Sequence, residues 1–301
     1  MSFINVTGCT ERTFEPSPPP ITETHRQVNN PKFSTIILAG DRSHGDPVAG
    51  MAQVSGKSIV PLAGIPMIVR VIEAIEASNM AGNITICGPA QSTIRECPAL
   101  QQMIDEHRVE WLPPGNSPCS SAAYCIDRVS GADPVFLTTA DHGLLNPDII
   151  GYFLKQSAAT KTDATVGLVD YQTIVNTYPA SRRTRIKFQN GSYCGCNLFS
   201  LFNDRGKKLV SIWKQVEEDR KHPFRILGRL LGPVRTLYYL LGRLTLEEAL
   251  RSLEEKYNIN TRAVILPYPA AGIDVDTVAD FHLVESILSA SLSIAAEPRR
   301  D

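Results

Sequence analysis

Residues 34–68 read S-T-I-I-L-A-G-D-R-S-H-G-D-P-V-A-G-M-A-Q-V-S-G-K-S-I-V-P-L-A-G-I-P-M-I. The stretch opens with an uncharged apolar run, residues 35–39, which is typical of a buried parallel strand. At Gly40 the run breaks into a loop rich in glycine, aspartate and serine, and a Gly-Ile-Pro turn predicts that a helix starts at about Pro66. The pattern therefore predicts a strand that feeds a ligand-binding loop.

The composition of this loop suits a phosphate group. It contains four glycines and a single lysine, namely Gly40, Gly45, Gly50, Gly56 and Lys57. Backbone amides next to glycine can approach phosphate oxygens closely, and one ammonium group supplies the point charge that a polyphosphate needs. The loop is not a Walker loop, because Met51 stands where the first glycine of that motif would be. We interpret it as a nucleotide-phosphate site, with an ordinary strand-to-helix connection as the alternative.

The stretch resembles the signature of the MobA-like nucleotidyltransferases, in which L-A-G-G-x-G-x-R-M is followed by a lysine and a P-L-x-G-x-P-L-I run. The corresponding residues here are 38–40, Lys57 and 61–68. Asp41 replaces the second glycine of the signature, and its Arg-Met pair has no clean equivalent. The resemblance implies a Rossmann-like fold of the GT-A type. It also implies that the nucleotide is contacted by Leu38, Ala39, Gly40, Asp41 and Lys57.

The composition describes a globular protein. The chain has 301 residues, of which 43% are hydrophobic and 20% are charged, and its formal net charge of -1 does not suggest a nucleic-acid partner. Seven cysteines without a C-x-x-C pair indicate a reducing compartment, so we expect a cytoplasmic protein. Residues 1–32 are rich in threonine, proline and charge and are expected to form a disordered tail, whereas residues 33–301 are expected to form the nucleotidyltransferase domain.

Strands and helices are expected to alternate after the loop. An amphipathic pattern predicts a helix over residues 67–78, and a short apolar run predicts a strand over residues 84–87. A helix interrupted near Pro98 is expected over residues 92–106, followed by a strand at residues 109–112. Such alternation favours an α/β fold with a mostly parallel sheet between helices.

The third strand leads into residues 113–121, P-P-G-N-S-P-C-S-S, and a helix is expected from about Ala122. Small hydroxyl residues at this place can cap the helix, or they can present amides and hydroxyls to a nucleotide. In MobA-like and methylerythritol-phosphate cytidylyltransferase-like proteins, a Gly…Ser segment at the matching place touches the nucleotide. The resemblance therefore implicates Gly115, Ser117, Ser120 and Ser121, and helix capping is the alternative.

Residues 134–142 read P-V-F-L-T-T-A-D-H, a buried strand that ends in a carboxylate. Because open α/β sheets bind ligands at the carboxyl ends of their strands, we expect Asp141 to point into a cleft. In the MobA-like family the aspartate after the matching strand holds the catalytic magnesium ion, and the resemblance implies this role for Asp141. The alternative is an aspartate that caps a turn. We expect His142 to be a solvated turn residue rather than a substrate contact.

Near the end of the chain, residues 271–281 read A-G-I-D-V-D-T-V-A-D-F, which resembles the family's D-I-D-T-P-E-D-L ending. In that family the second acidic residue completes the metal site, and Asp276 corresponds to it. Two carboxylates on strand-end turns suit one Mg²⁺ ion that bridges enzyme and triphosphate. The resemblance thus implies Mg²⁺ as the cofactor, held by Asp141 and Asp276, with Lys57, Asp141 and Asp276 as the catalytic residues.

A cationic segment, residues 182–188, reads R-R-T-R-I-K-F. Alternation along a strand would place three of its cations on one face, where they would attract an anion. The next expected strand, residues 193–199, carries an asparagine that matches one in several sugar-phosphate nucleotidyltransferases. The candidates for acceptor binding are therefore Arg183, Arg185, Lys187 and Asn197, and a solvated edge strand is the alternative.

Residues 203–258 are expected to form a helical insertion. Two helices of mixed charge flank the block P-F-R-I-L-G-R-L-L-G-P-V-R-T-L-Y-Y-L-L-G-R-L at residues 223–244. Its four arginines interrupt every apolar run before it reaches the ~20 residues of a membrane span. Helical periodicity places the arginines on or beside one face and leucines over most of the rest, with a hinge at Pro233. Such helices suit a membrane surface, a lipid-like acceptor, a buried lid or a dimer contact.

The loop with Lys57, the strand-end Asp141 and the D-V-D-T turn occur in the family's order over residues 35–283. The resemblance implies a Mg²⁺-dependent nucleotidyltransferase, in which an acceptor phosphate attacks the α-phosphorus of a nucleoside triphosphate and pyrophosphate is released. The acceptor phosphate is already ionised at neutral pH, so positioning and charge neutralisation would carry catalysis.

The sequence is also compatible with two alternatives, a GT-A glycosyltransferase that uses a nucleotide-sugar and a catalytically inactive regulatory homologue. The expected partners are a nucleoside triphosphate and a phosphorylated acceptor, which could be a lipid phosphate or an alcohol phosphate. Residues 223–244 are the candidate contact with the inner face of a membrane, or with a second copy of the chain in a homo-oligomer.

Overall fold

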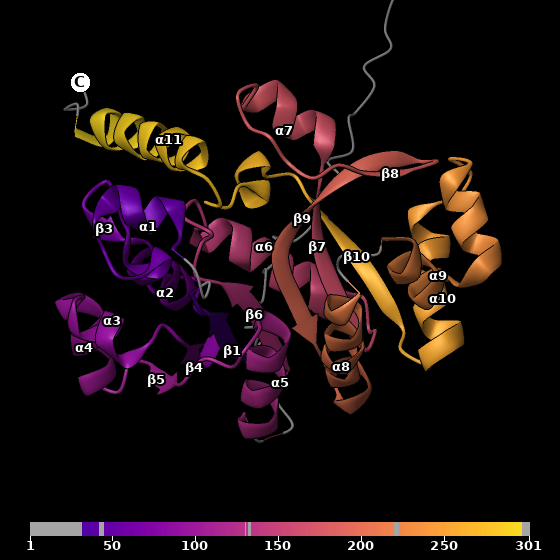
Figure 1. Cartoon of the computed structure of the whole chain (residues 1–301), viewed down its shortest axis with the longest axis horizontal. Coiled ribbons are helices and arrows are strands. Elements are labelled where there is room, and N and C mark those ends of the chain that lie inside the picture. Colours follow the sequence, from indigo (N-terminus) through magenta and orange to yellow (C-terminus); the bar gives the residue numbers. More distant parts are fainter. Residues whose placement is uncertain (1–31, 42–44, 130, 132–133, 220–222, 297–301) are drawn as a thin grey trace, which may run out of the picture.

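The computed structural model describes residues 32–41, 45–129, 131, 134–219 and 223–296. The predicted tail, residues 1–32, lies outside these ranges except for Lys32. The chain forms an α/β fold in which a mixed, largely parallel sheet of eight strands is flanked by helices (Figure 1). This architecture confirms the predicted fold class.

The sheet is built around a long run of parallel strands. Its strands are β1 (Phe33–Leu38), β4 (Ala81–Cys87), β5 (Glu110–Leu112), β6 (Val135–Thr139), β7 (Ala164–Asp170), β8 (Ile186–Phe188), β9 (Gly191–Leu201) and β10 (Thr261–Leu266). Their order is β10-β7-β9-β6-β1-β4-β5, and β8 pairs with β9. β9 runs antiparallel to β6, β7 and β8, and the other neighbours are parallel. β2 (Pro61–Leu62) and β3 (Ile65–Pro66) form a separate antiparallel pair.

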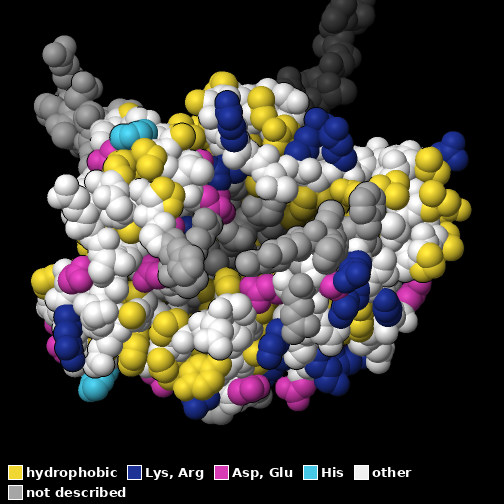
Figure 2. Space-filling model, viewed as in Figure 1, with side chains coloured by type: hydrophobic (Ala, Val, Ile, Leu, Met, Phe, Trp, Pro, Cys, Tyr) yellow, Lys and Arg dark blue, Asp and Glu magenta, His cyan; other side chains and the backbone are white. Residues whose placement is uncertain are grey.

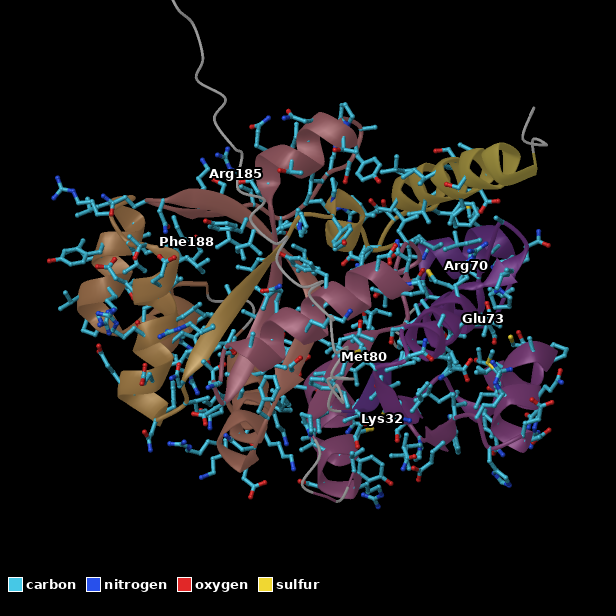
Figure 3. All side chains as sticks on the ribbon, turned by 180° about the vertical axis from the view of Figure 1, so that it is seen from behind. Lys32, Arg70, Glu73, Met80, Arg185 and Phe188 are labelled. Atoms are coloured by element: carbon cyan, nitrogen blue, oxygen red, sulfur yellow. The ribbon has the colours of Figure 1, made fainter. Side chains whose placement is uncertain are left out.

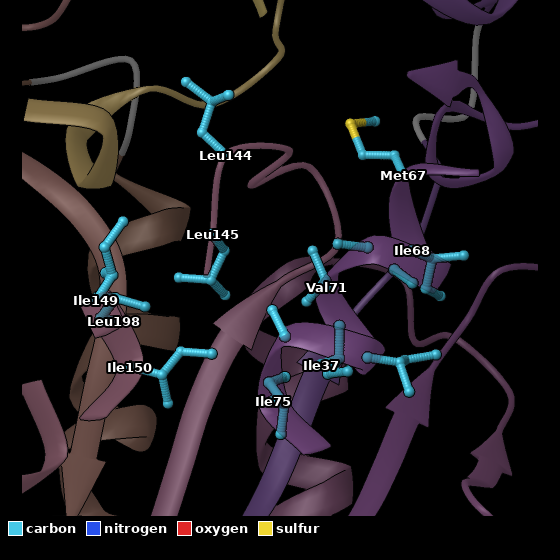
Figure 4. Close-up of a cluster of buried hydrophobic side chains, with 14 of the residues drawn as sticks. Ile37, Met67, Ile68, Val71, Ile75, Leu144, Leu145, Ile149, Ile150 and Leu198 are labelled. Carbon is cyan, nitrogen blue, oxygen red and sulfur yellow. The ribbon is translucent and has the colours of Figure 1, made fainter. Parts of the chain in front are cut away.

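β1 lies between β4 and β6, and its side chains alternate between two cores. Ile37 packs in the larger core with α2 (Met67–Ala77) and α6 (Pro147–Ala159), as Figure 4 shows. Ile36 and Leu38 pack in the smaller core against α5 (Pro118–Arg128) and α8 (Asp204–Glu218). Because both faces of the strand are buried, its sequence is a continuous apolar run rather than an alternating one.

The remaining helices are mostly short. They are α1 (Pro47–Ala52), η1 (Lys57–Ile59), α3 (Gln91–Arg95), α4 (Pro98–Asp105), α7 (Tyr171–Thr177), α9 (Pro223–Leu240), α10 (Leu246–Tyr257), η2 (Pro269–Gly272) and α11 (Val278–Ala296), where η marks a 3-10 turn. The division between α3 and α4 falls just before Pro98, as predicted. α11 begins directly after the D-V-D-T turn.

Two helices differ from the sequence-based expectation at their N-termini. α5 starts at Pro118 and not at Ala122, because Ser117 caps it by accepting a hydrogen bond from the amide of Ser120 at 3.1 Å. α1 lies inside the segment that was expected to be a continuous glycine loop. Its cap is Asp46, and Pro47 occupies the first helical position, a favourable start signal that the glycine pattern concealed.

The cationic strand is shorter than predicted. β8 begins only at Ile186, so Arg183 and Arg185 precede it and the three cations do not share a strand face. Alternation of residue types had suggested the strand, but its hydrogen-bonded ladder with β9 ends at the pair Ile186–Tyr193. Seen from behind in Figure 3, Phe188 of β8 points toward α9, where its ring lies 6.0 Å from that of Tyr239.

The predicted helical insertion divides into two parts. α8 packs on α5 beside the sheet, whereas α9 and α10 pack on each other, and α10 lies along the edge strand β10. α9 is interrupted at Gly232, whose φ of 76° is outside the helical region, and Pro233 follows. The hinge predicted at Pro233 is therefore present.

The C-terminal half of α9 carries an exposed apolar face. Its members are Val234, Leu237, Tyr238 and Leu240, together with Leu241 directly after the helix, each between 46% and 62% exposed, and Figure 2 shows hydrophobic side chains gathered over this helix. A lid buried within the chain is therefore the wrong interpretation for this half. Contact with a membrane and contact with a second copy stay predictions. Within the described ranges, no helix is both long enough and apolar enough to cross a bilayer.

Candidate active site

The three predicted catalytic residues meet at one point. Lys57 lies at the start of η1, Asp141 follows β6, and Asp276 lies in the turn before α11. The Nζ atom of Lys57 donates hydrogen bonds to Oδ2 of Asp141 at 2.7 Å and to Oδ1 of Asp276 at 3.1 Å. The structure therefore joins side chains from three distant parts of the sequence into one ion-paired cluster.

The sheet explains this meeting. β1 and β6 are parallel neighbours, with Leu38 paired to Thr139, so the loop after β1 and the turn after β6 leave the sheet side by side. The amide of Ala140 donates to the carbonyl of Leu38 at 2.9 Å, and the amide of Val275 donates to the carbonyl of Asp141 at 3.0 Å. The second bond attaches the turn that carries Asp276 to the end of β6.

The ion pair between Lys57 and Asp141 keeps these two groups in their ionised forms. Burial by itself would raise the pKa of Asp141, but the ammonium group of Lys57 and a 2.6 Å hydrogen bond from Oγ1 of Thr139 bring that pKa below its usual value. Burial by itself would lower the pKa of Lys57, but the carboxylates of Asp141 and Asp276 raise it above its usual value. Asp141 is thus a carboxylate and Lys57 an ammonium ion at neutral pH.

Asp41 orders the lysine loop. Its Oδ1 atom accepts a hydrogen bond from the backbone amide of Lys57 at 2.8 Å. A Cβ atom on Gly56 would lie 2.6 Å from Oδ2 of Asp41, so this close approach requires glycine at position 56. The residue that replaces the second glycine of the family signature therefore connects the loop after β1 directly to the lysine.

A cavity of about 760 Å³ opens in front of this cluster, a volume in the range of small-molecule sites. Its wall comes from the carboxyl ends of β1 and β6, the lysine loop, the N-terminus of α5, the turn before α11, and α8. The lining residues are Leu38, Ala39, Gly40, Asp41, Asp46, Lys57, Ser58, Gly115, Asn116, Ser117, Pro118, Ser121, Thr139, Ala140, Asp141, Glu217 and Asp276. The residues predicted to contact nucleotide after β1 all belong to this wall.

The segment before α5 combines capping with lining. Ser117 and Ser121 line the cavity, and Oγ of Ser121 accepts a hydrogen bond from the amide of Gly115 at 2.9 Å. Ser120 does not line it, because its hydroxyl turns back into the helix cap and accepts from the amide of Ser117 at 2.8 Å. Capping therefore applies to Ser117 and Ser120, whereas nucleotide contact stays a prediction for Gly115, Ser117 and Ser121, which line the cavity.

The predicted acceptor-binding residues lie outside this cavity wall. The side chain of Arg183 is only 6% exposed and forms ion pairs with Asp274 and Asp280, so it is not a free anion-binding group, and the prediction for it is corrected. Asn197 donates to Oδ2 of Asp274 at 3.2 Å. Arg185 and Lys187 are exposed, and their role in acceptor binding stays a prediction.

His142 is not a solvated turn residue. It is 1% exposed, and its Nε2 atom lies 2.7 Å from the carbonyl oxygen of Ala271 in η2. The turn after β6 is covered by the segment that leads to α11, which sequence distance gave no reason to expect. Burial lowers the pKa of His142, so the ring is neutral at neutral pH.

Several residues of the cavity wall were not predicted from the sequence. Thr139 stands two positions before Asp141 on the same side of the chain, and the two-residue period of a strand could have identified it. Asp46 carries the Asp-Pro start signal of α1. Glu217 comes from α8, and no local signal could have found it, because only the packing of α8 on α5 brings it to the cavity.

The donor set suits magnesium. The carboxylates of Asp141 and Asp276 converge on the point that the ammonium group of Lys57 occupies, and hard oxygen ligands of this type are those that Mg²⁺ prefers. Among the described residues, no group of three or more His, Cys, Asp or Glu side chains could hold a metal ion. An ion at this point would therefore complete its coordination with phosphate oxygens and water, as Mg²⁺ commonly does.

Comparison with known proteins agrees with this geometry. The family described as the MobA-like NTP transferase domain matches residues 35–264. A hypothetical transferase from Thermus thermophilus superposes with a TM-score of 0.69 at 26% identity, and the match covers 83% of this chain and 99% of the Thermus chain. No protein of curated function matches the sequence.

Two more distant structures share the fold. One is CMP:2-keto-3-deoxy-manno-octonic acid synthetase in complex with CTP, with a TM-score of 0.55, 12% identity and coverage of 86% of this chain and 99% of the other. The second is 4-diphosphocytidyl-2C-methyl-D-erythritol synthase from Anaerococcus prevotii DSM 20548, with a TM-score of 0.52, 9% identity and coverage of 87% and 100%. At these identities the likeness concerns the fold alone.

Proposed function

Because the chain belongs to the MobA-like NTP transferase family, we propose that it transfers a nucleoside monophosphate from a nucleoside triphosphate to a phosphorylated acceptor. The observation that carries the proposal is the convergence of Lys57, Asp141 and Asp276 on the wall of a nucleotide-sized cavity. An oxygen of the acceptor phosphate forms a bond to the α-phosphorus, and the bond from that phosphorus to the bridging oxygen breaks. The electron pair leaves with pyrophosphate.

Mg²⁺ is the proposed cofactor, and Asp141 and Asp276 are the residues that would hold it. When bound, it supplies positive charge that offsets the charge of the triphosphate. The described part of the cavity wall carries five carboxylates and one cation, namely Asp41, Asp46, Asp141, Glu217 and Asp276 with Lys57. Since a bare triphosphate would be repelled by this wall, we expect nucleotide binding to require a divalent ion.

The protein's own groups position the substrates. Lys57 keeps its proton, because its pKa is raised, and its ammonium group can donate to phosphate oxygens. The hydroxyl groups of Ser117 and Ser121 line the same cavity at the N-terminus of α5, where the helix dipole also favours an anion. These groups support a catalytic role that consists of orientation and charge neutralisation rather than proton transfer.

The proposed acceptor is a small alcohol phosphate or a lipid phosphate. Its phosphate group is ionised at neutral pH, so that the site needs no general base. We propose that two exposed cations, Arg185 directly before β8 and Lys187 within it, contribute to holding it. Arg185 lies over the ring of Tyr171 at 5.2 Å, which limits the range of positions of its guanidinium group.

Pyrophosphate release tests the proposal. The pure protein is incubated with each of the four nucleoside triphosphates, Mg²⁺ and a panel of phosphorylated acceptors, with reactions that lack acceptor or contain EDTA as controls. We expect release with one base, dependent on both acceptor and metal ion. Transfer from a nucleotide-sugar without pyrophosphate would instead indicate a glycosyltransferase. Nucleotide binding without turnover on any acceptor would indicate a regulatory protein.

A further inference from the structure

A buried guanidinium group lies outside the cavity, in the segment between α7 and β8. It belongs to Arg183, whose side chain is 6% exposed. Its NH1 and NH2 atoms form separate ion pairs, with Oδ1 of Asp274 and Oδ1 of Asp280, and its Nε atom donates to Oγ of Ser181 at 2.9 Å. Every nitrogen of the guanidinium group is therefore engaged inside the protein.

The two carboxylates that Arg183 joins stand on either side of Asp276. Asp274 lies two residues before it, and Asp280 lies four residues after it in the first turn of α11. Arg183 therefore forms an ion pair at each end of the short segment that carries the proposed metal ligand, Asp276. In Figure 1 this segment lies between η2 and α11, and η2 packs against α7, from which the chain continues to Arg183.

Asp280 connects Arg183 to the backbone of Asp276 through hydrogen bonds. While Oδ1 of Asp280 pairs with Arg183, its Oδ2 accepts hydrogen bonds from the amide of Asp276 at 3.3 Å, from the amide of Thr277 at 2.9 Å and from Oγ1 of Thr277 at 2.7 Å. The amide of Asp280 donates back to Oγ1 of Thr277 at 3.2 Å. Asp280 is 7% exposed, so these bonds are shielded from water.

The other side of the segment is anchored as well. Oδ2 of Asp274 accepts from the side-chain amide of Asn197 at 3.2 Å, and the amide of Val275 donates to the carbonyl of Asp141 at 3.0 Å. The backbone is thereby held immediately before and immediately after Asp276, while the carboxylate of Asp276 is turned toward Lys57. The side chain of Asp276 is itself 44% exposed, so burial orients it only in part.

We propose that Arg183 is a positioning residue for the transfer reaction: through Asp274 and Asp280 it holds the backbone of Asp276 so that both carboxylates face one point. The inference rests on the proposed function, in that Asp276 must hold a divalent ion together with Asp141. An arginine is required, because its planar fork can donate to two carboxylates from two different nitrogens, which the single ammonium group of a lysine does less well.

The main variants are Arg183→Lys, which keeps the charge, and Arg183→Gln, which removes it. Pyrophosphate release and the melting temperature are each measured as a function of Mg²⁺ concentration. For both variants we expect the Mg²⁺ concentration at half effect to rise by about tenfold or more, which is typical when a residue that orients a metal ligand is lost. KM for the triphosphate at saturating Mg²⁺ should change much less.

Arg235→Gln is the matched control. Arg235 also forms a two-nitrogen ion pair, with Glu255 at 2.6 and 2.8 Å, but on the surface between α9 and α10. This variant should keep the Mg²⁺ dependence of the native protein. Asp280→Asn is the complementary test, since it keeps the side-chain shape but weakens both the ion pair and the cap, and it should behave as the Arg183 variants do.

Where the Arg183 variants do not fold, Thr277→Val is the test, because it removes the hydroxyl that bonds to both Oδ2 and the amide of Asp280 and leaves no buried charge unpaired. It should raise the half-effective Mg²⁺ concentration by a few fold, and an unchanged value would overturn the inference. An equal Mg²⁺ response of Arg183→Lys, Arg183→Gln and the native protein would overturn it too. If the native protein shows neither a Mg²⁺-dependent melting temperature nor pyrophosphate release, the proposed function itself fails.

Discussion

The cluster around Lys57 and the C-terminal half of α9 differ in which side chains they expose to water. At the cluster, charged groups are largely shielded from water, and the side chains of Lys57 and Asp141 are 14% and 18% exposed. On and directly after α9, a valine, three leucines and a tyrosine are exposed to water at 46% to 62%, and Arg235 pairs with Glu255 of α10. Shielded charges need charged partners, and exposed apolar groups need apolar ones.

The two regions differ in whether their side chains have stabilising partners within the described chain. The cluster satisfies its charges internally, because the ammonium group of Lys57 lies between the carboxylates of Asp141 and Asp276. The α9 face has no such internal partner within the described chain, so its variants should affect neither folding nor turnover unless another surface covers it. The following predictions test that division.

The largest effect is expected from the cluster. Asp141→Asn and Asp276→Asn should each lower turnover by about a hundredfold or more, on the scale of losing one preorganised electrostatic group. Pyrophosphate release measures it. Glu255→Gln, which removes an acid from the α9–α10 contact, is the control and should keep native turnover. Near-native activity in either aspartate variant would remove that residue from the proposed metal site.

Substitution of two leucines within residues 223–244 should change the stability of the protein by different amounts. Leu244 is 1% exposed, so Leu244→Ala should cost about 2–5 kcal/mol of the free energy of unfolding. Leu237 is 54% exposed, and Leu237→Ala should cost less than about 0.5 kcal/mol. Denaturant unfolding measures both. A large, concentration-dependent loss for Leu237→Ala would show that a second copy of the chain covers the α9 face in solution.

Removing the ammonium group of Lys57 should make stability depend on metal. In Lys57→Met the carboxylates of Asp141 and Asp276 face each other without a cation, so the melting temperature without Mg²⁺ should fall by several degrees. Mg²⁺ should then raise it more than it raises that of the native protein, because the ion binds only the folded state. Lys256→Met, on α10, is the control, since Lys256 donates to the carbonyl of Arg229. Equal Mg²⁺ shifts in all three proteins would contradict the metal assignment.

The smallest effect is expected for Arg235→Gln. Its ion pair with Glu255 is largely solvated, with side chains 26% and 52% exposed, and pairs of this kind contribute little to stability. The melting temperature should change by less than about 2 °C in a calorimetric scan. A larger loss, or a loss of turnover with a water-soluble acceptor, would mean that α9 and α10 are coupled to the cavity.

Much of the fold could be predicted from local pattern. The apolar run of β1, the break before Pro98 and the hinge before Pro233 each follow from residues that are close in sequence. The same holds for Asp141, because a carboxylate after a buried parallel strand must leave the sheet at its ligand-binding edge. The sequence pattern did not predict helix α1, because the glycines around it favour a loop, although Asp46 and Pro47 are helix-start signals.

The sequence by itself determined which side chains form the candidate site: one lysine in a glycine-rich loop, one aspartate at a strand end and one in the D-V-D-T turn. Only the tertiary structure decided the partners of the other charged and polar groups. In the folded chain, Arg183 pairs with Asp274 and Asp280 and is not free to bind an acceptor. His142 is buried against Ala271, and Glu217 of α8 lines the cavity. The physical reason is that periodicity reports which side of an element a residue faces, whereas the group it meets there depends on how distant elements pack.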